Sequence, residues 1–181
     1  MRFRLAFVVT ALFISVGTVV STAVMAQGAR LSDAHIARIK AECAGAFVSI
    51  DQLHRSDARL RVNRGQYYEY ISTKLMAPLN GRIAFNRLDG TALIAATTQY
   101  EKALSQFRAD YITYEQAVAR VLKVNCYDEP QRFYELLMDA RQKRGVVHED
   151  VVLIHQYIDE YQAAFRTFRA DYELSVKGDG V

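Results

Sequence analysis

Apolar residues recur along most of the chain at the three- and four-residue spacing of amphipathic helices. The clearest run extends from Thr91 to about Asn125, where seven consecutive apolar or aromatic positions alternate between spacings of four and three. This alternation is a heptad seam, which places its members on one face of a helix. The predicted face consists of Leu93, Tyr100, Leu104, Phe107, Tyr111, Tyr114, Val118 and Val121.

Two weaker amphipathic segments precede this run. Ser32 and Asp33 offer an N-terminal cap to a first helix. We expect Asn63 and Gly65 to break or kink it, and a further helical piece is predicted over residues 66–76. The predicted apolar stripe of the first helix is Ile36, Ile39, Cys43, Ala46, Ile50, Leu53 and Leu60.

Two more helices are predicted after residue 128. The first begins at Pro130, and we expect it to end at Gly145, because the basic residues just before this glycine are typical of a helix C-terminus. The second runs from about His148 to Tyr172 and repeats the seam. The apolar positions are Phe133, Leu136, Leu137 and Ala140 in the first, and Val151, Ile154, Ile158, Tyr161, Phe165, Phe168 and Tyr172 in the second.

Turn-forming residues gather in one place between these helices. Pro78, Asn80-Gly81 and Asp89-Gly90 lie within residues 77–90, so we expect the chain to reverse there. A turn-rich β fold is disfavoured, because the chain has only 2 prolines in 181 residues. The sequence therefore predicts an all-α protein, an elongated antiparallel helical bundle with coiled-coil-like helical hairpins.

The first 26 residues have a different character. Arg2 and Arg4 precede an uncharged stretch over residues 5–26 that ends in small residues, which is the three-part form of a secretory signal peptide. A stretch of this length could also span a bilayer as an uncleaved anchor, at about 1.5 Å per residue. In both cases we expect the chain after residue 27 to be exported, with both arginines on the cytoplasmic side. The remainder divides into a helical domain over 27–174 and a flexible tail over 175–181.

Removing the export segment changes the charge balance. The whole chain has a formal net charge of +3, but without residues 1–26 it has 21 basic and 20 acidic side chains. A nearly neutral domain lacks the basic surface that a dedicated nucleic-acid-binding protein needs. We therefore expect no nucleic-acid partner, and membrane contact only through residues 1–26.

The two cysteines, Cys43 and Cys126, are predicted to form a disulfide, which is typical of exported proteins. In a helical hairpin that turns at 77–90, each cysteine lies about 50 Å from the bend, so the two come level with each other. Free buried thiols are the alternative.

Basic residues concentrate before and within the predicted bend. Residues 55–90 have seven basic side chains against three acidic ones. Such a tip could bind an anionic envelope polymer or an acidic partner. The alternative is an ordinary solvated helix surface with ion pairs four residues apart. The candidate interaction residues are Arg55, Arg59, Arg61, Arg64, Tyr67, Tyr68, Tyr70, Arg82 and Arg87.

Motifs that carry chemistry are missing from the sequence. It has no Gly-rich phosphate loop, nucleophile elbow, CxxC, HExxH or EF-hand loop, so we expect no catalytic residues and no cofactor. His148, His155 and Asp159 are weak candidates for a metal site, because spacings of seven and four place them on the same face of one predicted helix. Helical bundles that bind metals use Glu-x-x-His pairs, which this sequence lacks.

The expected function is that of an exported, non-enzymatic helical interaction or structural protein of the cell envelope. Two alternatives stay open. One is a carrier of a small ligand or metal, with its site among tyrosine and histidine side chains between helices. The other is a holdase-type chaperone that presents apolar grooves to unfolded clients. An exposed seam could also close a homo-oligomer.

Overall fold

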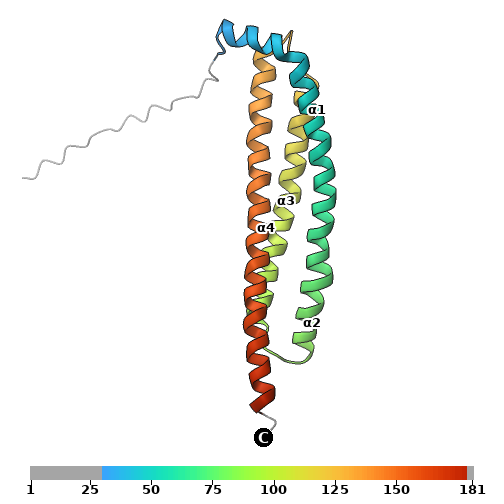
Figure 1. Cartoon of the computed structure of the whole chain (residues 1–181), viewed down its shortest axis with the longest axis vertical. Coiled ribbons are helices and arrows are strands. Elements are labelled where there is room, and N and C mark those ends of the chain that lie inside the picture. Colours follow the sequence, from blue (N-terminus) through green and yellow to red (C-terminus); the bar gives the residue numbers. More distant parts are fainter. Residues whose placement is uncertain (1–29, 179–181) are drawn as a thin grey trace, which may run out of the picture. The chain divides into compact units, whose positions relative to one another are not determined.

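The computed structural model describes residues 30–178, and every regular element in that range is helical (Figure 1). α1 spans Asp33–Tyr70 without the predicted break at Asn63 and Gly65. It continues through a π-helix, η1, at Ile71–Met76 into α2 at Ala77–Phe85. After a turn, α3 spans Thr91–Val121, and α4 spans Pro130–Gly178. The predicted all-α class is thus confirmed. The predicted export segment lies outside the described residues, and α4 continues four residues into the segment expected to be a tail.

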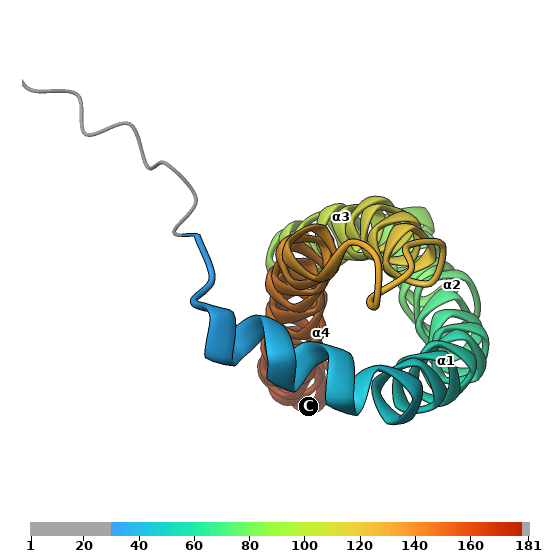
Figure 2. The same cartoon turned by 90° about the horizontal axis from the view of Figure 1, so that it is seen from above.

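Three helical arms pack side by side in a bundle-like arrangement (Figures 1 and 2). α1, η1 and α2 form the first arm, and α3 and α4 are antiparallel neighbours. The first turns of α1 cross the start of α4 (Figure 2), where the Leu31 N–H donates to Gln131 Oε1 at 2.9 Å. α1 bends after these first turns (Figure 1), and in this part of the helix the Gly45 carbonyl accepts a 2.9 Å hydrogen bond from Ser49 Oγ. A glycine and a serine that bonds back to the helix backbone favour such a bend. None of the described helices is long and apolar enough to cross a membrane.

The heptad seam of α3 forms the centre of the core. All of its predicted members, from Leu93 to Val121, are buried. α1 by contrast buries only Cys43 and Tyr68. The buried side chains form two clusters along the arms, and Val147 of α4 packs against both. The seam prediction for α3 is confirmed.

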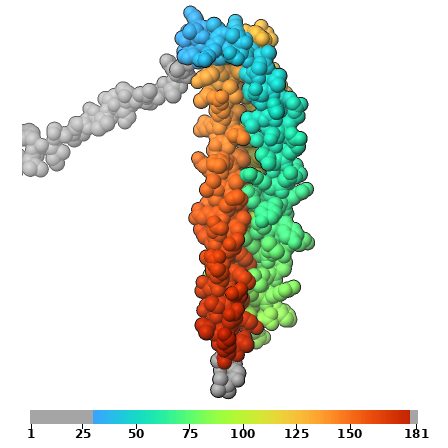
Figure 3. Space-filling model, in the orientation of Figure 1, coloured from blue at the N-terminus to red at the C-terminus, as the bar shows by residue number. Residues whose placement is uncertain are grey.

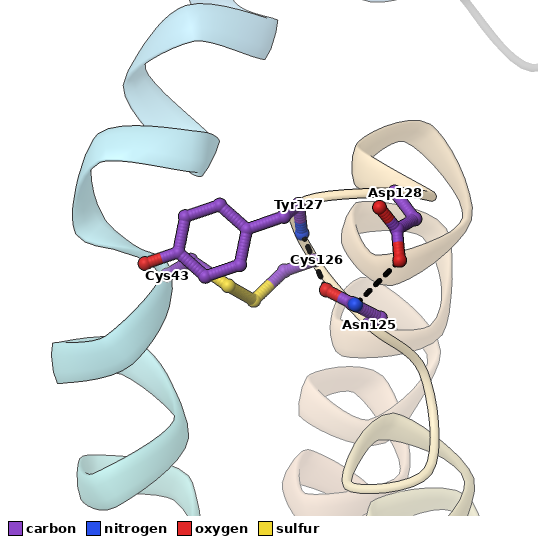
Figure 4. Close-up of a disulfide and its surroundings, with 5 residues drawn as sticks. All are labelled: Cys43, Asn125, Cys126, Tyr127 and Asp128. Carbon is purple, nitrogen blue, oxygen red and sulfur yellow. Dashed lines mark hydrogen bonds between the residues drawn. A yellow bond between two sulfur atoms is a disulfide. The ribbon is translucent and has the colours of Figure 1, made fainter.

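The two cysteines lie at disulfide distance, as predicted. Their Cα atoms are 5.8 Å apart, and the bond joins α1 to the loop between α3 and α4 (Figure 4). Asn125 shapes this loop, because its side-chain oxygen accepts a 2.9 Å hydrogen bond from the Tyr127 N–H. The disulfide therefore fixes the end of α1 that lies farthest from α2.

The predicted helix end at Gly145 is wrong. α4 passes through this glycine and extends for 49 residues, or about 73 Å. Glycine weakens a helix interior by about 1 kcal/mol, but Val147 and Val151 beyond it pack against the core and continue the helix. The last turns of α4 therefore lie at the same end as the turn between α2 and α3, not near the start of α1 (Figure 1). Tyr172, in those turns, is exposed rather than a seam residue.

The reversal of the chain occurs at residues 86–90, later than its predicted start at residue 77. Pro78 stands in the first turn of α2, where its missing N–H is tolerated. The π-helix before it widens the backbone, and the Ala77 N–H donates to the carbonyl of Ser72 five residues back. Asn80 and Gly81 are helical. Most of the residues that predict a turn therefore belong to the helical arm formed by α1, η1 and α2.

Replacing Gly145 with alanine is expected to raise the free energy of unfolding by about 0.5–1 kcal/mol. A Cβ atom at Gly145 would meet nothing within 4 Å. The same substitution at Gly90 supplies the contrast, because its Cβ would lie 2.7 Å from Ile83 Cγ2, so this variant should be destabilised. Chemical denaturation of both variants measures the difference. A Gly145→Ala protein less stable than its parent would contradict the uninterrupted helix.

Candidate functional site

The candidate interaction residues do not form a single tip. Arg55, Arg59, Arg61 and Arg64 belong to the middle of α1, roughly 30 Å or more from the turn at 86–90, because each helical residue advances only about 1.5 Å. Only Arg82 and Arg87 lie at or beside that turn. The predicted set therefore separates into two regions with different surroundings.

The α1 members also differ among themselves. Arg55 pairs with Asp51 at 2.7 Å, as an ordinary solvated helix surface would. Tyr67 and Tyr70 are exposed, but Tyr68 is buried in the core, so its assignment to the interaction surface is wrong. Tyr67 and Tyr68 are adjacent in sequence, but a helix rotates by about 100° per residue. Tyr68 therefore faces the core, whereas Tyr67 faces the solvent.

One of the two regions lies at the turn between α2 and α3. We name it the turn end and define it by Arg82, Phe85, Arg87 and Leu88. Phe85 is 86% exposed. Arg87 has φ 59°, in the left-handed region where glycine usually follows a helix. Its N–H donates to the Ala84 carbonyl at 3.0 Å and closes the end of α2. Within residues 30–178, neither arginine forms an ion pair.

More apolar side chains are exposed at this end of the molecule. The last turns of α4 extend beyond the turn between α2 and α3 (Figures 1 and 3). Tyr172, Leu174 and Val176 in those turns are all exposed. Exposed apolar side chains of α4 thus lie at the same end of the molecule as the turn end, whose two guanidinium groups have no ion-pair partner within residues 30–178.

The second region is the middle of α1, which presents polar side chains to the other helices. The predicted stripe residues Leu53 and Leu60 are exposed. Asp57 and Arg61 point inward instead, where they contact Tyr114 and Tyr111 of α3. The stripe prediction is wrong here because it assumed that only apolar residues could face the core.

Asp57 joins all three arms. Its Oδ2 accepts a 2.7 Å hydrogen bond from the Tyr114 hydroxyl of α3 and a 2.9 Å hydrogen bond from Arg144 Nε of α4. Burial by itself would raise the pKa of Asp57, but the hydrogen bonds from Arg144 and Tyr114 outweigh it and hold the pKa below its usual value. Asp57 is therefore ionised and balances the charge of Arg144.

A cavity of about 170 Å³ opens beside this group, between α1, α3 and α4; we name it the Arg61 pocket. The Arg61 guanidinium lies 4.8 Å from the centre of the Tyr111 ring. Tyr111 is only 3% exposed, and its hydroxyl has no hydrogen-bond partner among the described residues. The lining residues are Asp57, Leu60, Arg61, Arg64, Phe107, Tyr111, Tyr114, Arg144, Val147, His148 and Val151.

Sequence reasoning missed Asp57, Tyr111 and Arg144 as members of one site. The local sequence pattern places Arg144 at a helix end and Tyr111 in the apolar seam. One local signal was available, because positions 50, 57, 61 and 68 fall on one helix face and two of them are charged. The partners of those charges lie far away in sequence and could not be identified locally.

Asp150 of α4 is a buried carboxyl group, 8% exposed, whose Oδ2 finds no partner in the part of the chain that the structure describes. Burial first, and then the neighbouring Asp110 on α3, raise the pKa of Asp150 to about 6. The Asp150 carboxyl group therefore gains its negative charge near pH 6 rather than near pH 4.

Replacing Asp150 with asparagine should raise the melting temperature at pH 8, with a much smaller effect at pH 4. The pKa of Asp150 is higher in the folded protein than its ordinary value of 3.8, so the folded state binds this proton more tightly than the unfolded chain does. Its ionisation therefore reduces stability as the pH rises from about 4 through 6. Thermal melts of parent and variant at both pH values measure this, and an equal difference at the two would contradict it.

The weak metal candidates do not gather into a site. His148 lines the Arg61 pocket, whereas His155 Nε2 lies 3.0 Å from the Tyr68 hydroxyl. Asp159 lies beside His155 along a shallow depression on α4. No group of three His, Cys, Asp or Glu side chains within residues 30–178 could hold a metal ion.

No protein-family model, curated protein or solved structure matches this chain. Its function is therefore inferred from its own residues.

Proposed function

We propose that this protein is an exported, non-enzymatic interaction protein of the cell envelope that binds an acidic partner through its turn end. The observation that carries the proposal is Phe85, 86% exposed between two arginines that have no ion-pair partner in residues 30–178. Aromatic residues and arginines are enriched at the centres of protein interfaces, and the turn end has both. The seams of α3 and α4 form a stiff, coiled-coil-like support for this end.

The backbone conformation of Arg87 is a second observation in favour of the turn end as a binding surface. A residue other than glycine in the left-handed conformation costs roughly 1 kcal/mol, and such strain concentrates at functional positions. Glycine would close α2 at lower cost. We infer that the side chain is retained at Arg87 for its charge, which suits an acidic protein or an anionic envelope polymer.

Export is the part of the proposal that rests on residues 1–26 and on the cysteines. The basic, apolar and small-residue order of the first 26 residues is that of a secretory signal. A disulfide between Cys43 and Cys126 requires an oxidising compartment. We propose that the helical domain works outside the cytoplasmic membrane, either free or anchored by residues 5–26.

A crosslinking pull-down from intact cells tests this role. Arg87→Gly removes the charge and relieves the backbone, so we expect it to lose the partner without loss of stability. Phe85→Ala should lose the partner too, while Arg59→Ala, on the exposed surface of α1, is the matched control and should retain it. Capture that is equal for all three variants would contradict the turn-end proposal. The intact mass of the recovered chain shows at the same time whether residues 1–26 are removed.

A further inference from the structure

We propose that the Arg61 pocket binds a small organic carboxylate. This inference goes beyond the partner surface at the turn end and uses different residues. It also gives the small-ligand hypothesis a defined place, where two arginines of α1 meet a buried tyrosine of α3 and an apolar wall.

The charges around the pocket favour an anion. Arg144 is already paired with Asp57, through contacts of 2.9 and 3.3 Å. Arg61 and Arg64 also line the pocket, and neither has an ion-pair partner in the part of the chain that the structure describes. Their charges are therefore not balanced locally. A guanidinium group offers parallel N–H donors that match the two oxygens of a carboxylate.

The Tyr111 hydroxyl is the second, independent observation. It is buried without a hydrogen-bond partner in residues 30–178, although its residue lines the pocket. A buried hydroxyl without a partner lowers stability, so such groups call for an explanation. Burial raises the pKa of Tyr111, so the group is a neutral donor at physiological pH. A ligand oxygen in the pocket would accept its hydrogen bond.

The rest of the pocket limits the size and charge of the ligand. Leu60, Phe107, Val147 and Val151 supply apolar contacts. The volume of about 170 Å³ is below the roughly 300–1,000 Å³ of pockets for drug-sized molecules. The ionised Asp57 disfavours a doubly charged ligand. These features fit a monocarboxylate with a small apolar body.

Titration calorimetry on the exported protein tests this assignment. Benzoate is the probe, benzamide its neutral counterpart of the same shape, and inorganic phosphate the anion without an apolar body. We expect benzoate to bind at least tenfold more tightly than either, because only benzoate satisfies both the guanidinium groups and the apolar wall. No binding of benzoate, or equal binding of benzamide or phosphate, would overturn the proposal.

Three variants locate the binding. Arg61→Gln and Arg64→Gln should each weaken benzoate binding about tenfold, while Arg59→Gln on the same helix should leave it unchanged. Tyr111→Phe should weaken binding several-fold without lowering the melting temperature of the ligand-free protein, because it removes a hydroxyl that has no partner. Benzoate affinity that none of these substitutions changes would place the ligand elsewhere and contradict the assignment. The turn-end variants Phe85→Ala and Arg87→Gly should bind benzoate normally, so the two proposals fail independently.

Discussion

Replacing Cys43 and Cys126 with alanine is expected to lower the free energy of unfolding by about 4–5 kcal/mol. The two cysteines are 83 residues apart in sequence, so the bond restricts a long loop of the unfolded chain. The effect should be large for this fold because α1 buries so little else. Apart from the cysteine, Tyr68 is its only buried residue.

Denaturation of the oxidised and the reduced parent protein is the best control, because it breaks the bond without changing a side chain. Both should unfold as all-helical proteins, the reduced form at lower denaturant concentration. The double alanine variant should match the reduced parent and be insensitive to reductant. Two free thiols per chain in unreduced exported protein, or a melting temperature that reductant leaves unchanged, would show that the bond does not form.

Replacing Tyr68 with alanine is expected to cost about 3–5 kcal/mol, the usual effect of removing a large buried aromatic ring. Tyr68 is 1% exposed and packs edge to face against Phe107 of α3, with ring centres 6.0 Å apart. Its hydroxyl lies 3.0 Å from His155 Nε2 of α4. One side chain of α1 thus contacts both other arms, and its removal leaves a cavity between all three.

Two variants separate the causes of this loss. Tyr68→Phe keeps the ring and loses only the contact with His155, so it should cost about 0.5–1.5 kcal/mol. Tyr67→Ala removes the neighbouring tyrosine, which is 61% exposed, and should change stability by about 0.5 kcal/mol or less. Urea denaturation of Tyr68→Ala, Tyr68→Phe and Tyr67→Ala measures the three free energies of unfolding. Equal losses for Tyr67→Ala and Tyr68→Ala would contradict the orientation of α1 described above.

The disulfide and Tyr68 together explain how α1 is held. The seam of α3 packs closely against α4, and the core clusters draw most of their buried residues from these two helices and the η1 and α2 segments. α1 is fixed at one end by Cys43 and near the other by Tyr68, with Asp57 and Arg61 between them. The polar middle of α1 leaves room for the Arg61 pocket where apolar side chains would have filled the core.

The sequence by itself determined the features that depend on neighbouring residues. The heptad spacing from Tyr100 to Val121 identified the buried face of α3, since a helix repeats its face within a few residues. Ser32 was identified as a helix cap, and its side chain accepts a hydrogen bond from the His35 N–H. The cysteine pairing also followed, because a constant rise per residue turns sequence distance into length along a hairpin.

Only the tertiary structure decided the features that depend on partners far away in sequence. Gly145 looked like a helix end, but the packing of Val147 and Val151 against other helices outweighs its low helix propensity. Arg61 and Tyr68 looked like one basic, aromatic surface, yet cross-helix contacts turn both inward. A polar side chain faces the core only when a partner on another helix satisfies it, and that partner is absent from the local pattern. For this reason the heptad seam of α3 was predictable, and the Arg61 pocket beside it was not.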